Sequence, residues 1–215
     1  QHWAPCYDFG IFSQMFNYMK ETLQPLTTCE RDGLLSHFAV HFSPIYYLLL
    51  PFFFIFPSPV TLLMGQAAII ASGLIPLYLI CKRHKLSNAA VILFSLCYVL
   101  LPSMANGCFF FLHENKFLTP LILWLAFALE KNKWIPSVIF TLLLLAVKED
   151  APVYAAVLGL YFIVSRRNIS KGALVFVLSI IYFITVSYFM SKYGLGTMSY
   201  RYDNFIYDGS GSLFT

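Results

Sequence analysis

Lys148, Glu149 and Asp150 make up a whole turn between two short apolar runs. An ionised side chain costs about 2.5–3.5 kcal/mol at the centre of a membrane helix, so three in succession call for a polar setting. Because the flanking runs are short, we expect the turn to lie in a cavity walled by longer helices. There Glu149 or Asp150 would bind a metal or a basic partner, and Lys148 an anion such as a phosphate. In the alternative, a solvated turn, Asp150 caps the next helix and Pro152 occupies its first turn.

A second candidate is Asp8, which lies in the aromatic segment Tyr7-Asp8-Phe9-Gly10-Ile11-Phe12-Ser13-Gln14. A carboxylate in an apolar setting has a raised pKa because desolvation disfavours its charged form. A raised pKa suits a general base. The local alternative is that Asp8 caps the amphipathic helix that follows it. We expect Tyr7 and Gln14 to support this site.

Other polar candidates each have a structural alternative. His113 and Glu114 could ligate a divalent ion, although Phe109-Phe110-Phe111 before them is typical of an interfacial aromatic belt. His41 could support the same site or extend to a membrane interface as a polar tip. Arg201, beside two tyrosines, could hold a phosphate or a sugar, or anchor the chain at the interface.

The composition places these residues in a membrane protein. Of the 215 residues, 59% are hydrophobic and 11% are charged, against about 45–50% and about 25% in ordinary soluble domains. So few charges exclude a soluble enzyme, a disordered region and a secreted disulfide scaffold. The net charge of +4 comes from scattered lysines and arginines, which does not indicate nucleic-acid binding.

Six apolar runs predict an all-α polytopic bundle of about six spans. They are Val60–Cys81, Ala89–Ala105, Phe117–Leu129, Trp134–Val147, Ala151–Val164 and Ala173–Met190. The middle three are shorter than the roughly 17 residues that a span requires, so flanking residues or neighbouring helices must complete them. A further stretch, Phe42–Phe56, contains Pro44 and Pro51 and predicts a bent, partly embedded helix. We therefore expect an outer segment with amphipathic and re-entrant helices at 1–59, the bundle at 60–190 and the start of an outer loop at 191–215.

The charges of the connectors predict the orientation. Three alternate connectors, 82–85, 130–133 and 166–171, together hold eight Lys/Arg and one acid, whereas the rest of the chain holds six and nine. Cytoplasmic loops carry the Lys/Arg excess. We therefore expect a multi-pass protein of the plasma membrane with these connectors in the cytoplasm, and with the acidic loops and both ends outside.

Four of these features occur in an order that resembles a known family. Tyr7-Asp8-Phe9-Gly10-Ile11-Phe12, His41-Phe42-Ser43-Pro44, the prolines from Pro51 to Pro59, and Lys148-Glu149-Asp150 together resemble the domain-of-unknown-function 2079 family of predicted prokaryotic membrane proteins. The resemblance covers nearly the whole chain. Family members are longer, so we expect a fragment that lacks the first helix and the C-terminal part. Members commonly show Asp-Phe-His-Pro-Glu where this chain has Phe111-Leu112-His113-Glu114-Asn115, which weakens a metal role for that connector.

The family is similar in layout to the GT-C glycosyltransferases, which place an essential acid in the first outer loop. The resemblance implies sugar transfer from a polyprenyl-phosphate donor to an outer-face acceptor, with membrane lipid as a partner. Asp8 would act as base or as ligand of a divalent metal such as Mg²⁺ or Mn²⁺. Lys148 or Arg201 would neutralise the donor phosphate. The alternatives are a transporter or flippase of a lipid-linked or polar substrate, and a non-catalytic membrane assembly protein.

Overall fold

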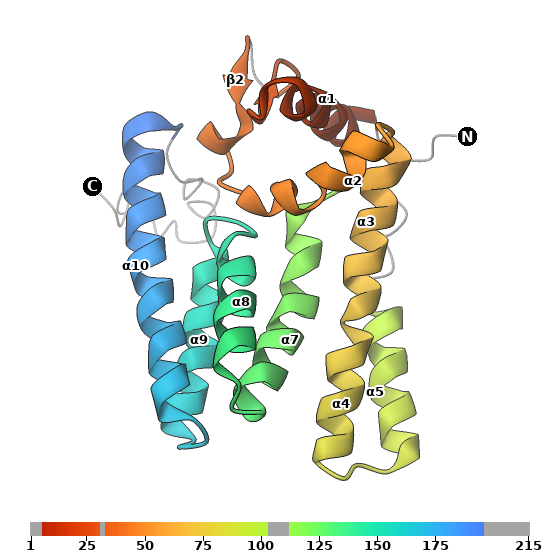
Figure 1. The fold of residues 1–215 in the computed structure, drawn as a ribbon, viewed down its shortest axis with the longest axis vertical. Coiled ribbons are helices and arrows are strands. Elements are labelled where there is room, and N and C mark those ends of the chain that lie inside the picture. The colour runs from red at the N-terminus through yellow and green to blue at the C-terminus, as the bar shows by residue number, and fades with distance from the viewer. Residues whose placement is uncertain (1–5, 31–32, 103–111, 196–215) are drawn as a thin grey trace, which may run out of the picture.

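The computed structural model describes residues 6–30, 33–102 and 112–195, and nearly all of its regular structure is helical (Figure 1). The first part, residues 6–58, forms a cap of short elements across the top of the bundle. Its elements are α1 (Cys6–Thr22), β1 (Leu26–Thr27), β2 (Leu35–Ser36), η1 (His37–Ala39), η2 (Pro44–Leu48) and α2 (Leu50–Ile55). The two strands pair antiparallel, with Leu26 opposite Ser36.

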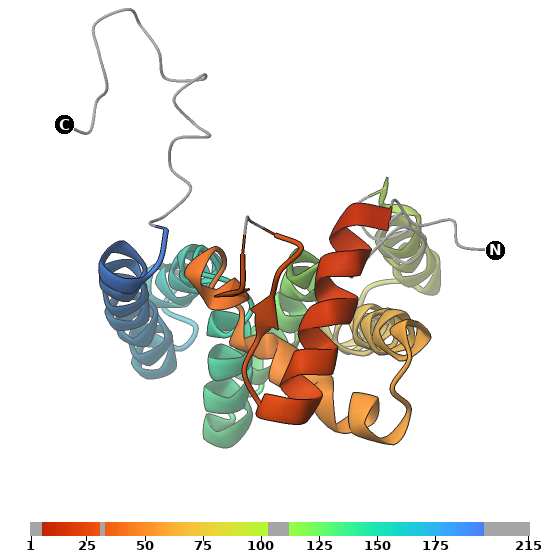
Figure 2. The same ribbon diagram turned by 90° about the horizontal axis from the view of Figure 1, so that it is seen from above.

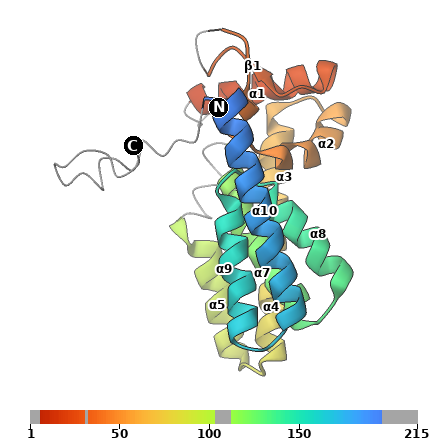
Figure 3. The same ribbon diagram turned by 90° about the vertical axis from the view of Figure 1, so that its left-hand side faces the viewer.

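The elements of the bundle lie below this cap (Figure 1). They are α3 (Pro59–Ser72), α4 (Leu74–Arg83), α5 (Asn88–Leu100), η3 (Glu114–Phe117), α7 (Leu118–Glu130), α8 (Trp134–Leu145), α9 (Ala151–Val164) and α10 (Ile169–Tyr193). Seen from above, α1 crosses over the bundle (Figure 2). Seen from the side, α10 runs beside α9 along one flank (Figure 3).

The helix lengths support a membrane protein and leave the six spans as a prediction. Among the described residues, two helical stretches are long and apolar enough to cross a bilayer: Pro59–Arg83, which joins α3 to α4, and Ile169–Tyr193, each with 25 residues. Three further apolar helices, α5, α8 and α9, are shorter. The stretch 42–56 is broken as the prolines predict, because Pro44 begins η2 and Pro51 lies in the first turn of α2.

The three basic connectors share one local geometry. Lys85, Asn132 and Arg166 each have a positive φ, between 54° and 56°. A left-handed residue just after a helix lets the following amides bond to the last carbonyls, as the Leu86 amide does to the Cys81 carbonyl at 3.0 Å. These turns end α4, α7 and α9, and each reverses the chain into the next helix at the lower end of the bundle (Figure 1).

The core lies where the cap meets the bundle. Phe16 and Tyr46 of the cap and Leu112 and Phe117 of the connector are all fully buried there. The outward faces of the helices are apolar instead, and Val157 and Ile184, for example, are each 62% exposed. Exposed apolar faces on well-packed helices are expected where lipid is the solvent.

Candidate functional site

Polar side chains from three distant segments meet beneath the cap. They come from the segment 37–46, from the connector 113–114 and from the turn 148–150. We call this set, with the residues that bond to it, the acidic end of the bundle. The three basic connectors, 82–85, 130–133 and 166–171, form the basic end at the opposite extremity (Figure 1).

Glu114 is the centre of the acidic end, and only 1% of it is exposed. The Tyr46 hydroxyl donates to its Oε2 at 2.5 Å. Lys148 Nζ lies 3.4 Å from its Oε1, and His113 Nδ1 lies 3.4 Å from its Oε2. A buried carboxylate needs this many partners because an unpaired buried charge is strongly destabilising.

These partners set the charge states of the pair His113 and Glu114. Burial raises the pKa of Glu114, but the charges of His113 and Lys148 and the Tyr46 hydrogen bond outweigh it, so the pKa is lowered. Burial lowers the pKa of His113; the charge of Glu114 opposes this effect and that of Lys148 adds to it, and the pKa is lowered. The Asn115 amide also donates to His113 Nδ1 at 3.3 Å. Glu114 is therefore a carboxylate at neutral pH, and Lys148 is its cation.

Glu149 joins the turn to the cap. Its Oε1 is 2.9 Å from His41 Nδ1, and its Oε2 accepts from the Phe42 amide at 3.0 Å. Burial raises the pKa of Glu149, but the His41 hydrogen bond outweighs that effect and the pKa is lowered. His41 is thus a partner of Glu149, and not the free interfacial tip that was its alternative.

Asp150 has a different environment from its neighbours. It occupies the N-cap position of α9, with Pro152 in the first turn, yet its side chain makes no capping bond. Its Oδ1 is buried and has no hydrogen-bond partner among the described residues. Burial, together with the charge of Glu149, raises the pKa of Asp150 despite the opposing effect of Lys148. The capping alternative therefore matches the position of Asp150 but not its chemistry.

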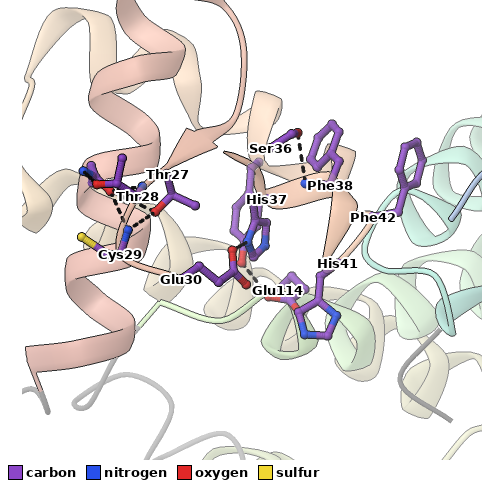
Figure 4. Close-up of polar contacts among 12 residues, drawn as sticks. Thr27, Thr28, Cys29, Glu30, Ser36, His37, Phe38, His41, Phe42 and Glu114 are labelled. Atoms are coloured by element: carbon purple, nitrogen blue, oxygen red, sulfur yellow. Dashed lines mark hydrogen bonds and ion pairs between the residues drawn. The ribbon is translucent and has the colours of Figure 1, made fainter. Parts of the chain in front are cut away.

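The segment 37–42 has two chemically different faces. His41 bonds its amide to the His37 carbonyl at 2.8 Å, so residues four apart lie on one side. Figure 4 shows His37 and His41 directed towards Glu114, and Phe38 and Phe42 on the other side of the segment. His37 Nδ1 is paired with Glu30 at 2.8 Å. The histidine face therefore belongs to the acidic end, and the phenylalanine face packs against other rings, such as Tyr182.

Gln14 stabilises the cap and does not reach the acidic end. Its Oε1 accepts from the Thr27 hydroxyl at 2.9 Å and from the Thr28 amide at 2.8 Å, and its Nε2 donates to the Thr28 hydroxyl. These bonds attach β1 to α1. The supporting role expected for Gln14 is therefore one of fixing the cap.

Three predicted site residues are placed only in part, or not at all. Tyr7 and Asp8 lie in the first turn of α1, and their side chains are outside the described structure. Because α1 begins at Cys6, Asp8 lies inside this helix and does not precede it as a cap would. Arg201 lies beyond the last described residue, Leu195.

The acidic end does not form a metal site from the residues that the structure describes. Among them, no group of three or more His, Cys, Asp or Glu side chains is arranged to hold a metal ion. The oxygens of Glu114 and Glu149 face Tyr46, Lys148, His41 and the Phe42 amide instead. A metal bound by Asp8 stays a prediction.

Sequence reasoning missed two members of the acidic end. Tyr46 gave no signal, because an aromatic residue in an apolar stretch is ordinary. Gln66 gave one, since it is a polar residue within the apolar run Val60–Cys81. It is fully buried in α3, and its Oε1 accepts from the His113 amide at 2.9 Å. This bond fixes the connector that carries Glu114.

A family model described as a predicted membrane protein, DUF2079, matches residues 4–214. No curated protein and no solved structure matches the chain.

Proposed function

Because the chain belongs to the DUF2079 family of predicted membrane proteins, we propose that it is a membrane glycosyltransferase of the GT-C type. It transfers a sugar from a polyprenyl-phosphate donor to an acceptor at the outer face of the plasma membrane. The observation that carries the proposal is the convergence beneath the cap, where Lys148 meets Glu114 and Glu149 meets His41. Buried, paired and pKa-shifted groups in one place are typical of reaction sites.

Two carboxylates are candidates for the base that accepts the proton of the acceptor hydroxyl. Asp8 follows from the resemblance, and α1, which carries it, lies at the same end of the bundle as the turn 148–150 (Figure 1). Asp150 follows from the geometry, because its pKa is raised and its buried Oδ1 has no partner in the described structure. A pKa nearer to the working pH is what general base catalysis requires.

Lys148 is the described residue that can neutralise the donor phosphate. Its side chain is 12% exposed and is oriented by Glu114, which Tyr46 and His113 hold in turn. A fixed cation stabilises charge that develops on a leaving phosphate without reorganisation during the step. Arg201 is proposed to act on the same phosphate.

The polar residues between the two ends argue against a transport path. Ser137, Thr141 and Ser179 are buried, and each donates its hydroxyl to a carbonyl four residues earlier in the chain. Transporters place ionisable or unwound elements near the midplane. In the described helices, the ionisable groups gather at the two ends instead, which favours an enzyme over a transporter or flippase.

The test is a transfer assay of the full-length protein in lipid with polyprenyl-phosphate sugars. We expect Asp8→Asn or Asp150→Asn to lower the transfer rate by about 10²–10⁴-fold, the usual contribution of a general base. Glu21→Gln is the matched control, because Glu21 is an exposed acid on the same helix as Asp8. EDTA followed by Mg²⁺ or Mn²⁺ tests the metal requirement. Undiminished transfer in both aspartate variants would contradict the proposal, as would no transfer by the wild type with any such donor.

A further inference from the structure

A half-open groove runs between the cap and the upper half of α10. Its volume is about 530 Å³, within the range of about 300–1,000 Å³ that is usual for ligand sites. The residues that line it are mainly aromatic and apolar, and include Phe38, Phe42, Tyr182, Thr185, Phe189 and Tyr193. The groove is therefore where the phenylalanine face of the segment 37–42 meets α10.

The position of the groove on α10 indicates what can enter it. α10 is one of the two stretches long and apolar enough to span a bilayer among the residues described. The groove residues Tyr182 and Thr185 each follow an exposed isoleucine. These isoleucines, Ile181 and Ile184, are 56% and 62% exposed. Because that exposed face would contact lipid, the apolar molecules that reach the groove are the hydrocarbon chains of the bilayer.

One end of the groove adjoins the acidic end. Phe42 lines the groove with its ring, and its amide holds Glu149 at 3.0 Å. Tyr182 packs against Phe42 with 6.5 Å between ring centroids, and its buried hydroxyl has no hydrogen-bond partner within the described part of the chain. A ligand in the groove thus has an apolar wall along its length, and Glu149 lies behind Phe42 and near the Tyr182 hydroxyl at one end.

Charge decides which head group suits that end. Glu149 and Asp150 are carboxylates, and the Lys148 ammonium is directed towards Glu114. A phosphate on the Glu149 side of the turn would meet like charge, whereas a hydroxyl can donate to a carboxylate.

We propose that the groove binds one hydrocarbon chain of a membrane lipid whose uncharged head group carries a hydroxyl directed at Glu149. This part of the inference rests on the proposed function: the lipid in the groove belongs to the class of molecule that accepts the sugar. The phosphate of the donor then lies on the Lys148 side of the turn.

Photo-cross-linking with two matched lipids tests this inference on the full-length protein in bilayer discs. The probes are a diacylglycerol and a phosphatidic acid that carry the same diazirine-labelled chain, so that they differ only in hydroxyl against phosphate. We expect cross-links at Phe189 and Tyr193, several-fold more with the diacylglycerol than with the phosphatidic acid. Equal or greater labelling by phosphatidic acid would overturn the assignment of the head group. Labelling of the groove no greater than at the bilayer-facing Val157 of α9 would overturn the groove itself.

A pair of tryptophan variants adds a control for position. Thr185→Trp fills the groove from an exposed position on α10, whereas Ile184→Trp adds the same side chain to the adjacent exposed face. We expect only Thr185→Trp to reduce diacylglycerol labelling several-fold, and equal labelling in both variants would contradict the proposal. Protein–protein adducts at the groove in place of lipid adducts would show that a second copy of this chain occupies the groove. That result would contradict the lipid proposal. Cross-linking requires no turnover. Labelling of the groove without any sugar transfer would therefore contradict the proposed function and leave the lipid groove supported.

Discussion

The two ends of the bundle differ in the sign of their excess charge and in how far their ion pairs are buried. At the basic end, the single acid Glu130 is surrounded by cations. It faces Arg83, His84 and Arg167 at 3.0–3.7 Å; Glu130 itself is 13% exposed, and these three partners are 43–49% exposed. At the acidic end, Glu114 and Lys148 are 2% and 12% exposed, and the carboxylates outnumber the lysine.

This difference shows that similar ion pairs perform different tasks. Glu130 contacts residues of the other two basic connectors, so it attaches α4, α7 and α9 to one another at their ends. Water reaches the basic partner in each of these pairs and screens the interaction, so each pair contributes little. Glu114 and Lys148 have lost most of their water, so each depends on its partners. We therefore expect the acidic end to be sensitive to substitution and the basic end to be tolerant.

The largest contrast is expected between the two central glutamates. Glu114→Ala leaves Lys148 buried without its carboxylate, and we expect a loss of about 3–5 kcal/mol in the free energy of unfolding. Glu130→Ala, the matched control, should cost no more than about 1 kcal/mol because its partners are solvated. Chemical unfolding in mixed micelles measures both values. Equal losses would show that burial does not distinguish the two ends.

A smaller contrast is expected between two histidines that bind carboxylates. His41→Ala removes a hydrogen bond to the half-buried Glu149 and should cost about 1–3 kcal/mol. His84→Ala removes a similar bond to Glu130 at 3.0 Å from an exposed position, and should cost about 0–1 kcal/mol. The same unfolding measurement applies. A larger loss for His84 than for His41 would reverse the comparison.

The smallest effect is expected at Asp150, where substitution should raise the free energy of unfolding and not lower it. A carboxyl whose pKa is raised in the folded state binds more protons there, so its contribution to stability falls as the pH rises through the raised value. Asp150→Asn keeps a residue suited to the N-cap and removes this loss. We expect the variant to gain up to about 1 kcal/mol at neutral pH, since partial exposure screens the charge. The difference should vanish below the ordinary aspartate pKa. A loss of stability at neutral pH would contradict the raised pKa.

Glu114 and Glu149 should give the opposite pH dependence. Their pKa values are lowered, so their contribution is present above the ordinary glutamate pKa and is lost as the pH falls through the lowered values. The wild type should therefore lose stability on acidification below about pH 4.3. Glu149→Gln should lose less than the wild type over that range. Identical acid profiles for the two proteins would contradict the lowered pKa of Glu149.

Hydropathy and charge predicted the local features of this fold. The apolar run Val60–Cys81 corresponds to the helical stretch Pro59–Arg83, and the prolines predicted the break in the stretch 42–56. Such features depend on neighbours in the sequence, so a single sequence contains them. The turn at 148–150 was predicted for the same reason.

The partners within the acidic end depend on tertiary packing. His41 and Glu149 are 108 residues apart, and no local pattern specifies which histidine a given carboxylate meets. One signal was available: the spacing of His37, Phe38, His41 and Phe42 places each pair on its own face of a helical turn. The sequence indicated the N-cap position of Asp150, but the absence of a capping bond depends on how its side chain is packed in the folded protein.

The sidedness of the two ends tests the central claim most directly. In a chain whose native cysteines are replaced, single cysteines are introduced at Leu34 of the cap and at Lys131 of the basic end, both of which are exposed. Intact cells are then treated with a membrane-impermeant maleimide. We predict that Leu34→Cys is labelled in intact cells and that Lys131→Cys is labelled only after the membrane is opened. Labelling of Lys131→Cys alone, or of both in intact cells, would contradict the account.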